Sequence, residues 1–114
     1  MPPTLSVCND SSLAEQIQAA FPELKVVKSL NTMTAPLMVN PSLLSGDHNA
    51  FVGGNDVGAK ALVVTILEAF GWKRENIIDL GDITSARGLE MYLPLWLRLY
   101  GGFQTPMLNI RIVR

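Results

Sequence analysis

Apolar side chains recur every three or four residues in three stretches of the chain, the spacing of one face of an α-helix. The first stretch begins at Ser12, which together with Glu15 three positions later matches a capping box. The second stretch ends at Gly71, a residue type suited to the left-handed position that follows a helix. The pattern therefore predicts helices over residues 12–20, 59–70 and 86–100.

Short runs rich in β-branched or alternating apolar residues lie between these helices and are typical of strands. Three of them cover residues 25–30, 50–53 and 76–80, and a fourth lies near residues 108–112, where Leu108, Ile110 and Ile112 alternate with polar residues. Strands separated by helices predict an α/β fold with three or four strands in a mostly parallel sheet and about three helices. We expect a single domain over residues 1–114, with residues 1–11 as a lead-in segment and a long loop between the first two strands.

The predicted helix over residues 86–100 is more apolar than a surface helix, because Glu90 and Arg98 are the only charged residues between Gly88 and Gly101. Pro94 should kink this helix, and the pair Gly101-Gly102 should end it. We expect a second chain, or a further part of the same protein, to cover its apolar surface. The alternative is that the helix is the centre of this domain's own core.

The composition of the chain argues against several classes of function. The chain has 114 residues, 17% of them charged, and a net charge of −1, which does not predict binding to nucleic acid or to an anionic membrane. One cysteine and one histidine exclude an internal disulfide and do not supply the Cys/His cluster of a zinc site, so we expect no metal. The absence of an apolar run of about 20 residues or a signal sequence leads us to expect a cytoplasmic protein.

Several single features have simple structural interpretations. Gly53 to Asp56 follow a strand and open a helix, where phosphate loops occur, but the spacing fits no phosphate-loop template and Asn55 or Asp56 is better interpreted as a helix cap. His48 is interpreted as a solvated loop residue, and Cys8 has no motif that would make it a nucleophile.

Two polar loops, Asn31–Thr34 and Gly81–Arg87, each come directly after an apolar strand. Ligands bind outside the carboxyl ends of strands in open α/β sheets, so the two loops are candidates for one shared site. Thr84 or Ser85 would offer a hydroxyl, and Arg87 a fork for a carboxylate or a phosphate. The alternative is that Asp82 or Thr84 caps the next helix and Arg87 pairs with Glu90, and both interpretations can hold together.

Four motifs in this order resemble the carboxyl-terminal half of the NADP oxidoreductase family that depends on coenzyme F-420, a family similar to the cytoplasmic domain of membrane ferric reductases. The motifs are Val26 to Thr32, Phe51 to Asp56 with Ala59-Lys60, Asp79 to Met91, and Pro94 to Leu97. The resemblance extends from about Ser12 to Val113. It implies the carboxyl-terminal part of a Rossmann-like NAD(P)-binding fold that lacks the first glycine-rich βαβ unit.

The resemblance also implies an activity and its cofactors, namely hydride transfer between NADP(H) and a deazaflavin or similar acceptor. It implies that Asn31, Thr32 and Met33 lie by the nicotinamide. It further implies that the second loop walls the acceptor pocket, through Gly81, Asp82, Ile83, Thr84, Ser85 and Arg87. The cofactors perform the chemistry in such enzymes, so no catalytic acid or base is assigned.

The glycine-rich turn that holds the pyrophosphate in this family has no counterpart in the chain. We therefore expect the chain alone to bind NADP weakly or not at all and to require an amino-terminal Rossmann half, which would pack beside the strand near Val27. The alternative is a non-catalytic remnant that acts as a dimerisation or interaction module. The expected partner is accordingly that missing half or further copies of the chain.

Overall fold

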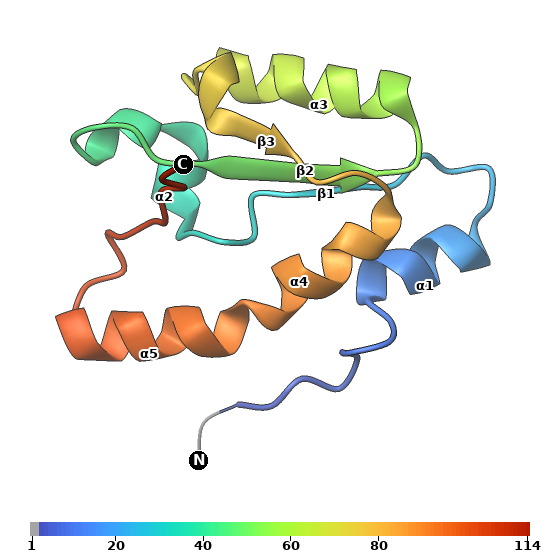
Figure 1. Ribbon diagram of the computed structural model, residues 1–114, viewed down its shortest axis with the longest axis horizontal. Helices are drawn as coiled ribbons and strands as arrows, with labels where there is room; N and C mark the ends of the chain where they lie inside the picture. The colour runs from blue at the N-terminus through green and yellow to red at the C-terminus, as the bar shows by residue number, and fades with distance from the viewer. Residues whose placement is uncertain (1–2) are drawn as a thin grey trace.

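The computed structural model describes residues 3–114 and contains one mixed sheet of three strands (Figure 1). The strands are β1 (Val27–Ser29), β2 (Ala50–Gly54) and β3 (Ile77–Asp79), in the spatial order β1-β2-β3. The pairing of β2 with β3 is parallel, as predicted for these two strands. The pairing of β1 with β2 is antiparallel, so the prediction of a mostly parallel sheet is wrong for this edge.

Helices cover both faces of the sheet. Helix α3 (Val57–Ala69) lies on one side, and α1 (Leu13–Ala20), α4 (Ala86–Met91) and α5 (Leu93–Phe103) lie on the other (Figure 1). The shorter elements are helix α2 (Ala35–Val39) and three 3-10 turns, η1 (Pro41–Leu43), η2 (Arg74–Asn76) and η3 (Ile83–Ser85).

Alternate residues of β2 point to opposite faces of the sheet, and the buried apolar side chains of the protein form two separate clusters. Ala50 and Val52 belong to the larger cluster, together with Met33, Leu37, Leu67 and Trp72. The smaller cluster joins α1 to the segment that follows β3, through Ala14, Ile83 and Ala86. Every residue of β2 is buried, so this strand is the centre of the fold.

Two helix starts agree with the sequence prediction. The Ser12 hydroxyl accepts a hydrogen bond from the Glu15 N–H at 3.1 Å, and Asp56 Oδ2 accepts one from the Ala59 N–H at 2.7 Å. These bonds satisfy N–H groups that have no partner inside their own helix. Gly71, just after α3, has a positive φ of 108°, as expected for a glycine that ends a helix.

The predicted fourth strand is absent from the described residues. Residues 107–114 are extended but form no ladder, and their backbone contact with the sheet region is the Asn49 N–H donating to the Ile110 carbonyl at 3.0 Å. The Ile112 N–H donates to the side chain of the same asparagine, Asn49 Oδ1, at 2.7 Å. The Asn109 side chain donates in turn to the Asn49 carbonyl at 3.0 Å, so this segment is anchored by two asparagines rather than by strand pairing.

Two other expectations need correction. Residues 35–39 are a helix rather than loop, because Pro36 lies in its first turn, where a missing N–H costs nothing. The helix predicted over residues 86–100 divides at Tyr92, two residues before Pro94, which agrees with the expected kink. The second part runs through Gly101 and Gly102 to Phe103, so the glycine pair does not end it.

Candidate functional site

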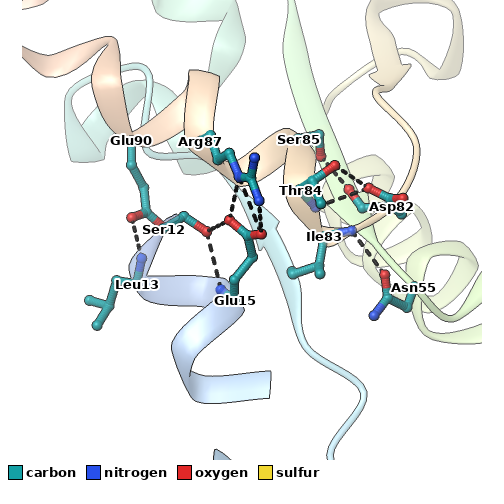
Figure 2. A network of polar contacts seen from close by, with 10 residues as sticks. All are labelled: Ser12, Leu13, Glu15, Asn55, Asp82, Ile83, Thr84, Ser85, Arg87 and Glu90. Carbon is teal, nitrogen blue, oxygen red and sulfur yellow. Dashed lines mark hydrogen bonds and ion pairs between the residues drawn. The ribbon is translucent and has the colours of Figure 1, made fainter. Parts of the chain in front are cut away.

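The polar loop after β3 forms the short turn η3, and its side chains mostly bond to one another. Asp82 Oδ1 accepts hydrogen bonds from the Thr84 N–H at 3.0 Å and from the Thr84 hydroxyl (Figure 2). Asn55 Oδ1 accepts from the Ile83 N–H at 3.0 Å. The expected capping role of Asp82 is confirmed, whereas Thr84 donates its hydroxyl to Asp82 and does not cap the helix.

The glycine pair at the end of β2 exists for close packing. A Cβ atom at Gly53 would overlap Ser85 Oγ, which donates a hydrogen bond to the Asp82 carbonyl at 2.7 Å. A Cβ atom at Gly54 would come within 2.7 Å of the Val26 carbonyl. The chain itself packs closely against both glycines, which agrees with a packing role for the pair.

Two carboxylates near this loop are held in their charged form. The pKa of Asp79 lies below its ordinary value because the side chain accepts the Gly81 N–H and, at 3.0 Å, the Lys60 ammonium. The pKa of Asp82 is lowered by the Thr84 hydroxyl and N–H. Each carboxylate therefore has its own set of donors, and the two do not share a proton as an acid/base pair would.

Arg87 forms an ion pair with α1. Its Nη2 lies 2.8 Å from Glu15 Oε1 and its Nε lies 3.0 Å from Glu15 Oε2, a two-pronged pair that lowers the pKa of Glu15 (Figure 2). The expected pairing of Arg87 with Glu90 is wrong. Each side chain has another partner in α1. Arg87 binds the Glu15 carboxylate, and the Glu90 carboxylate accepts the first backbone N–H groups of the helix.

Glu90 is a connecting residue that the sequence did not reveal. Its carboxylate accepts the N–H groups of Leu13 at 2.6 Å and Ala14 at 3.1 Å, and it lies 3.5 Å from the Lys28 ammonium. Leu13 and Ala14 are more than 70 positions away from Glu90 in sequence, so no local pattern predicts these contacts. The available signal was indirect, because the first N–H groups of any helix need acceptors.

The three residues predicted near the nicotinamide differ in exposure. Thr32 and Met33 are buried, at 3% and 5% exposure, and Met33 belongs to the main core. Asn31 is exposed, and its side-chain Nδ2 donates to the Leu89 carbonyl at 2.8 Å. A surface pocket of about 340 Å³ lies beside Asn31 and is lined by Leu5, Ser6, Val7, Leu13, Lys28, Asn31, Glu90 and Leu93.

The two predicted site loops lie at opposite ends of the sheet. Asn31 follows the carboxyl end of β1, which runs antiparallel to β2, whereas Gly81 follows the carboxyl end of β3, which runs parallel to β2. The expectation that both loops share one sheet edge is therefore wrong. Helix α4 links them, because it starts next to the η3 turn and its Leu89 carbonyl accepts from Asn31.

His48 is buried, in contrast to the solvated position expected for it. The side chain is 6% exposed, with Nε2 2.8 Å from the Pro41 carbonyl and Nδ1 2.7 Å from Asn109 Nδ2. Its ring also meets the edge of Trp72 at a centroid distance of 5.0 Å. Both ring nitrogens have partners within the chain, so the role of His48 is structural.

Searches for other kinds of site within residues 3–114 gave two negative findings. No group of three or more His, Cys, Asp or Glu residues in this range is arranged to hold a metal ion. No helix in the same range is long and apolar enough to cross a membrane.

Comparison with known proteins identifies a relative of solved structure. No family model and no curated protein matches the chain. Among solved structures, it is similar to a protein from Arthrobacter sp. FB24 that is provisionally assigned as an F-420-dependent NADP reductase, with 56% sequence identity and a TM-score of 0.95 over 100% of this chain. The match covers 51% of that protein, so the chain spans about half of its length. Over its whole length the chain is therefore similar to about half of a protein provisionally assigned to the family of NADP oxidoreductases that depend on coenzyme F-420.

Proposed function

We propose that the chain is the acceptor-side, carboxyl-terminal half of an NADP-dependent oxidoreductase. Its role would be to help transfer hydride between NADP(H) and a deazaflavin or similar acceptor, together with a nucleotide-binding half. The observation that carries the proposal is the relative, which matches the whole of this chain at 56% identity while extending over about as much sequence again.

We assign NADP and the hydride acceptor to different parts of the complete protein. We assign the pyrophosphate of NADP to the second half, because Ser85 and the Val26 carbonyl pack closely against Gly53 and Gly54 at the end of β2. We place the nicotinamide ring or the acceptor ring in the pocket beside Asn31, where Leu13 and Leu93 give apolar walls and Asn31, Lys28 and Glu90 give polar ones. The bound cofactors would supply the hydride chemistry, and the chain would supply position and a water-poor wall.

Calorimetric titration of NADPH into the purified chain tests the need for a second half. We expect no tight binding, because the sequence contains no G-x-G-x-x-G turn of the kind that holds the phosphates at a helix start. Micromolar or tighter binding by the chain alone would overturn this part of the proposal.

A second candidate function is a non-catalytic module that associates with another copy of itself. It is supported by α5, none of whose eleven residues is buried. Light scattering at micromolar concentration separates the two candidates in part, because a monomeric chain would speak strongly against self-association.

A further inference from the structure

Lys28 brings a positive charge to the pocket beside Asn31. The pocket has a volume of about 340 Å³, and Lys28 and Glu90 are the charged residues among those that line it. The Lys28 side chain is 25% exposed and that of Glu90 is 13% exposed, so both charges are largely shielded from solvent. A charge in such a position acts on a ligand more strongly than a fully exposed charge, because less water and salt screen it.

The Glu90 carboxylate does not cancel this positive charge. Its oxygens accept the N–H groups of Leu13 at 2.6 Å and Ala14 at 3.1 Å, at the start of α1, where the helix itself carries a partial positive charge. The Lys28 ammonium lies 3.5 Å from Glu90 Oε2, farther than the roughly 2.7–2.9 Å of a charge-assisted hydrogen bond. Lys28 and the start of α1 together therefore outweigh the single carboxylate on this side of the pocket.

We propose that the pocket beside Asn31 holds the hydride acceptor and that Lys28 stabilises the reduced, anionic form of the acceptor ring. This inference rests on the proposed function, which supplies both reactants. A hydride carries a proton and two electrons, so its transfer from NADPH to an uncharged ring leaves NADP⁺ and gives the ring one negative charge. Lys28 therefore stabilises the reduced ring more than the oxidised ring, and this difference favours transfer toward the acceptor.

The charge of Lys28 also decides between the two rings that the pocket could hold. The nicotinamide ring of NADP is positively charged in its oxidised form, and a lysine beside it would oppose that form. A deazaflavin spreads the negative charge of its reduced form over carbonyl oxygens and ring nitrogens, which accept hydrogen bonds from an ammonium group. Leu13 and Leu93 give the same pocket apolar walls for the faces of a flat ring.

Binding of deazariboflavin to the purified chain tests the inference, with the oxidised and the reduced forms titrated separately in anaerobic, mildly alkaline buffer. We expect the reduced form to bind at least about tenfold more tightly, as one partly shielded charge would produce. Lys28→Met should lower this preference to less than about twofold, whereas Lys28→Arg should retain it, because arginine keeps the charge. The matched control is Lys25→Met, at an exposed lysine outside the pocket lining, which should leave the preference unchanged.

The affinity for the oxidised form checks the fold of each variant, because loss of the Lys28 charge alone should leave that affinity nearly unchanged. A parallel loss of both affinities in Lys28→Met would overturn the inference, since it would show a structural role for Lys28. Equal affinity of the wild-type chain for the two forms, a preference that survives Lys28→Met, or no binding of either form would overturn it as well.

Titration of NADPH into the same chain tests the proposed function separately. Tight binding of NADPH by the chain alone would overturn the need for a second half and would leave a preference that depends on Lys28 standing. Weak binding of NADPH without such a preference would remove the role of Lys28 and would leave the proposed function in place.

Discussion

At the scale of single residues, several polar groups that suggest a ligand site are already bonded within the chain. Arg87 has the fork that an anion would need, yet both of its prongs contact Glu15. The glycine pair Gly53-Gly54 follows a strand as a phosphate loop would, yet the chain packs closely against both residues. The residue type alone therefore does not separate a binding role from a packing role, and the neighbours decide.

The packing role of Gly53 leads to a stability prediction. Gly53→Ala should lower the free energy of unfolding by about 1–3 kcal/mol, the usual cost of overpacking, because the new methyl group would overlap Ser85 Oγ. The control is Gly88→Ala within α4, where a Cβ atom meets nothing within 4 Å and alanine should stabilise the helix by about 0.5–1 kcal/mol. Urea denaturation measures both changes.

A second variant separates overlap with Ser85 from a general effect on β2. Removing the hydroxyl with Ser85→Ala should make Gly53→Ala less costly than it is in the wild-type background, since residues in contact are coupled. Equal costs in the two backgrounds would show that Ser85 is not the group that excludes a side chain at position 53.

At the scale of elements, two charged side chains of α4 bind the first turn of α1. Glu90 accepts the first two N–H groups of α1, and Arg87 holds Glu15 in the same turn (Figure 2). An acceptor from another helix thus adds to the local cap provided by Ser12. The arrangement also fixes the direction in which α4 leaves the sheet, and hence the start of α5.

Removing this acceptor should loosen α1. Glu90→Ala leaves the N–H groups of Leu13 and Ala14 without their partner, so we expect a loss of about 1–3 kcal/mol in the free energy of unfolding. Amide exchange at these two residues should accelerate as well. The control is Glu75→Ala in the exposed η2 turn, which should change stability by less than about 0.5 kcal/mol. Unchanged exchange at Leu13 and Ala14 would contradict the assigned role of Glu90.

The sequence predicted the elements whose signals are local and missed those decided by distant contacts. The capped starts at Ser12 and Asp56 and the break near Pro94 depend on neighbouring residues, and all three are found. The antiparallel direction of β1 and the burial of His48 depend on partners far along the chain. For the candidate site, the loop conformation at Asp82 was predictable, whereas the separation of the two loops required the direction of β1.

At the scale of the whole molecule, strand β2 and helix α5 differ in how far the chain itself buries them. Strand β2 is buried throughout by its own chain, whereas α5 has no buried residue. Exposed apolar surface of this kind usually marks a contact with another protein or domain. The fold is thus complete around β2 and open around α5, which agrees with a chain that matches half of its relative.

The charged form of several carboxylates makes the stability of the whole chain dependent on acid. The pKa values of five carboxylates lie below their ordinary values because each accepts hydrogen bonds in the folded chain, the five being Glu15, Asp47, Glu68, Asp79 and Asp82. A carboxylate with a lowered pKa contributes stability above the pKa of its unfolded form, and this contribution is lost as the pH falls through the folded value. We therefore expect the free energy of unfolding to decrease as the pH falls below about 4.5, the ordinary value of a glutamate.

Glu15→Gln identifies how much of this dependence comes from the pair between α1 and α4. At neutral pH the variant should be less stable than the wild type, because Arg87 loses its charged partner. The difference should shrink as the pH falls below about 4.5 and through the lowered folded pKa of Glu15, since the wild-type Glu15 then becomes protonated and also loses its charge. Urea denaturation at a series of pH values measures the difference, with Glu68→Gln as the control, because its pair with Arg74 is more exposed to solvent and should contribute less. A difference that stays constant with pH would show that the contribution of Glu15 does not depend on its charge.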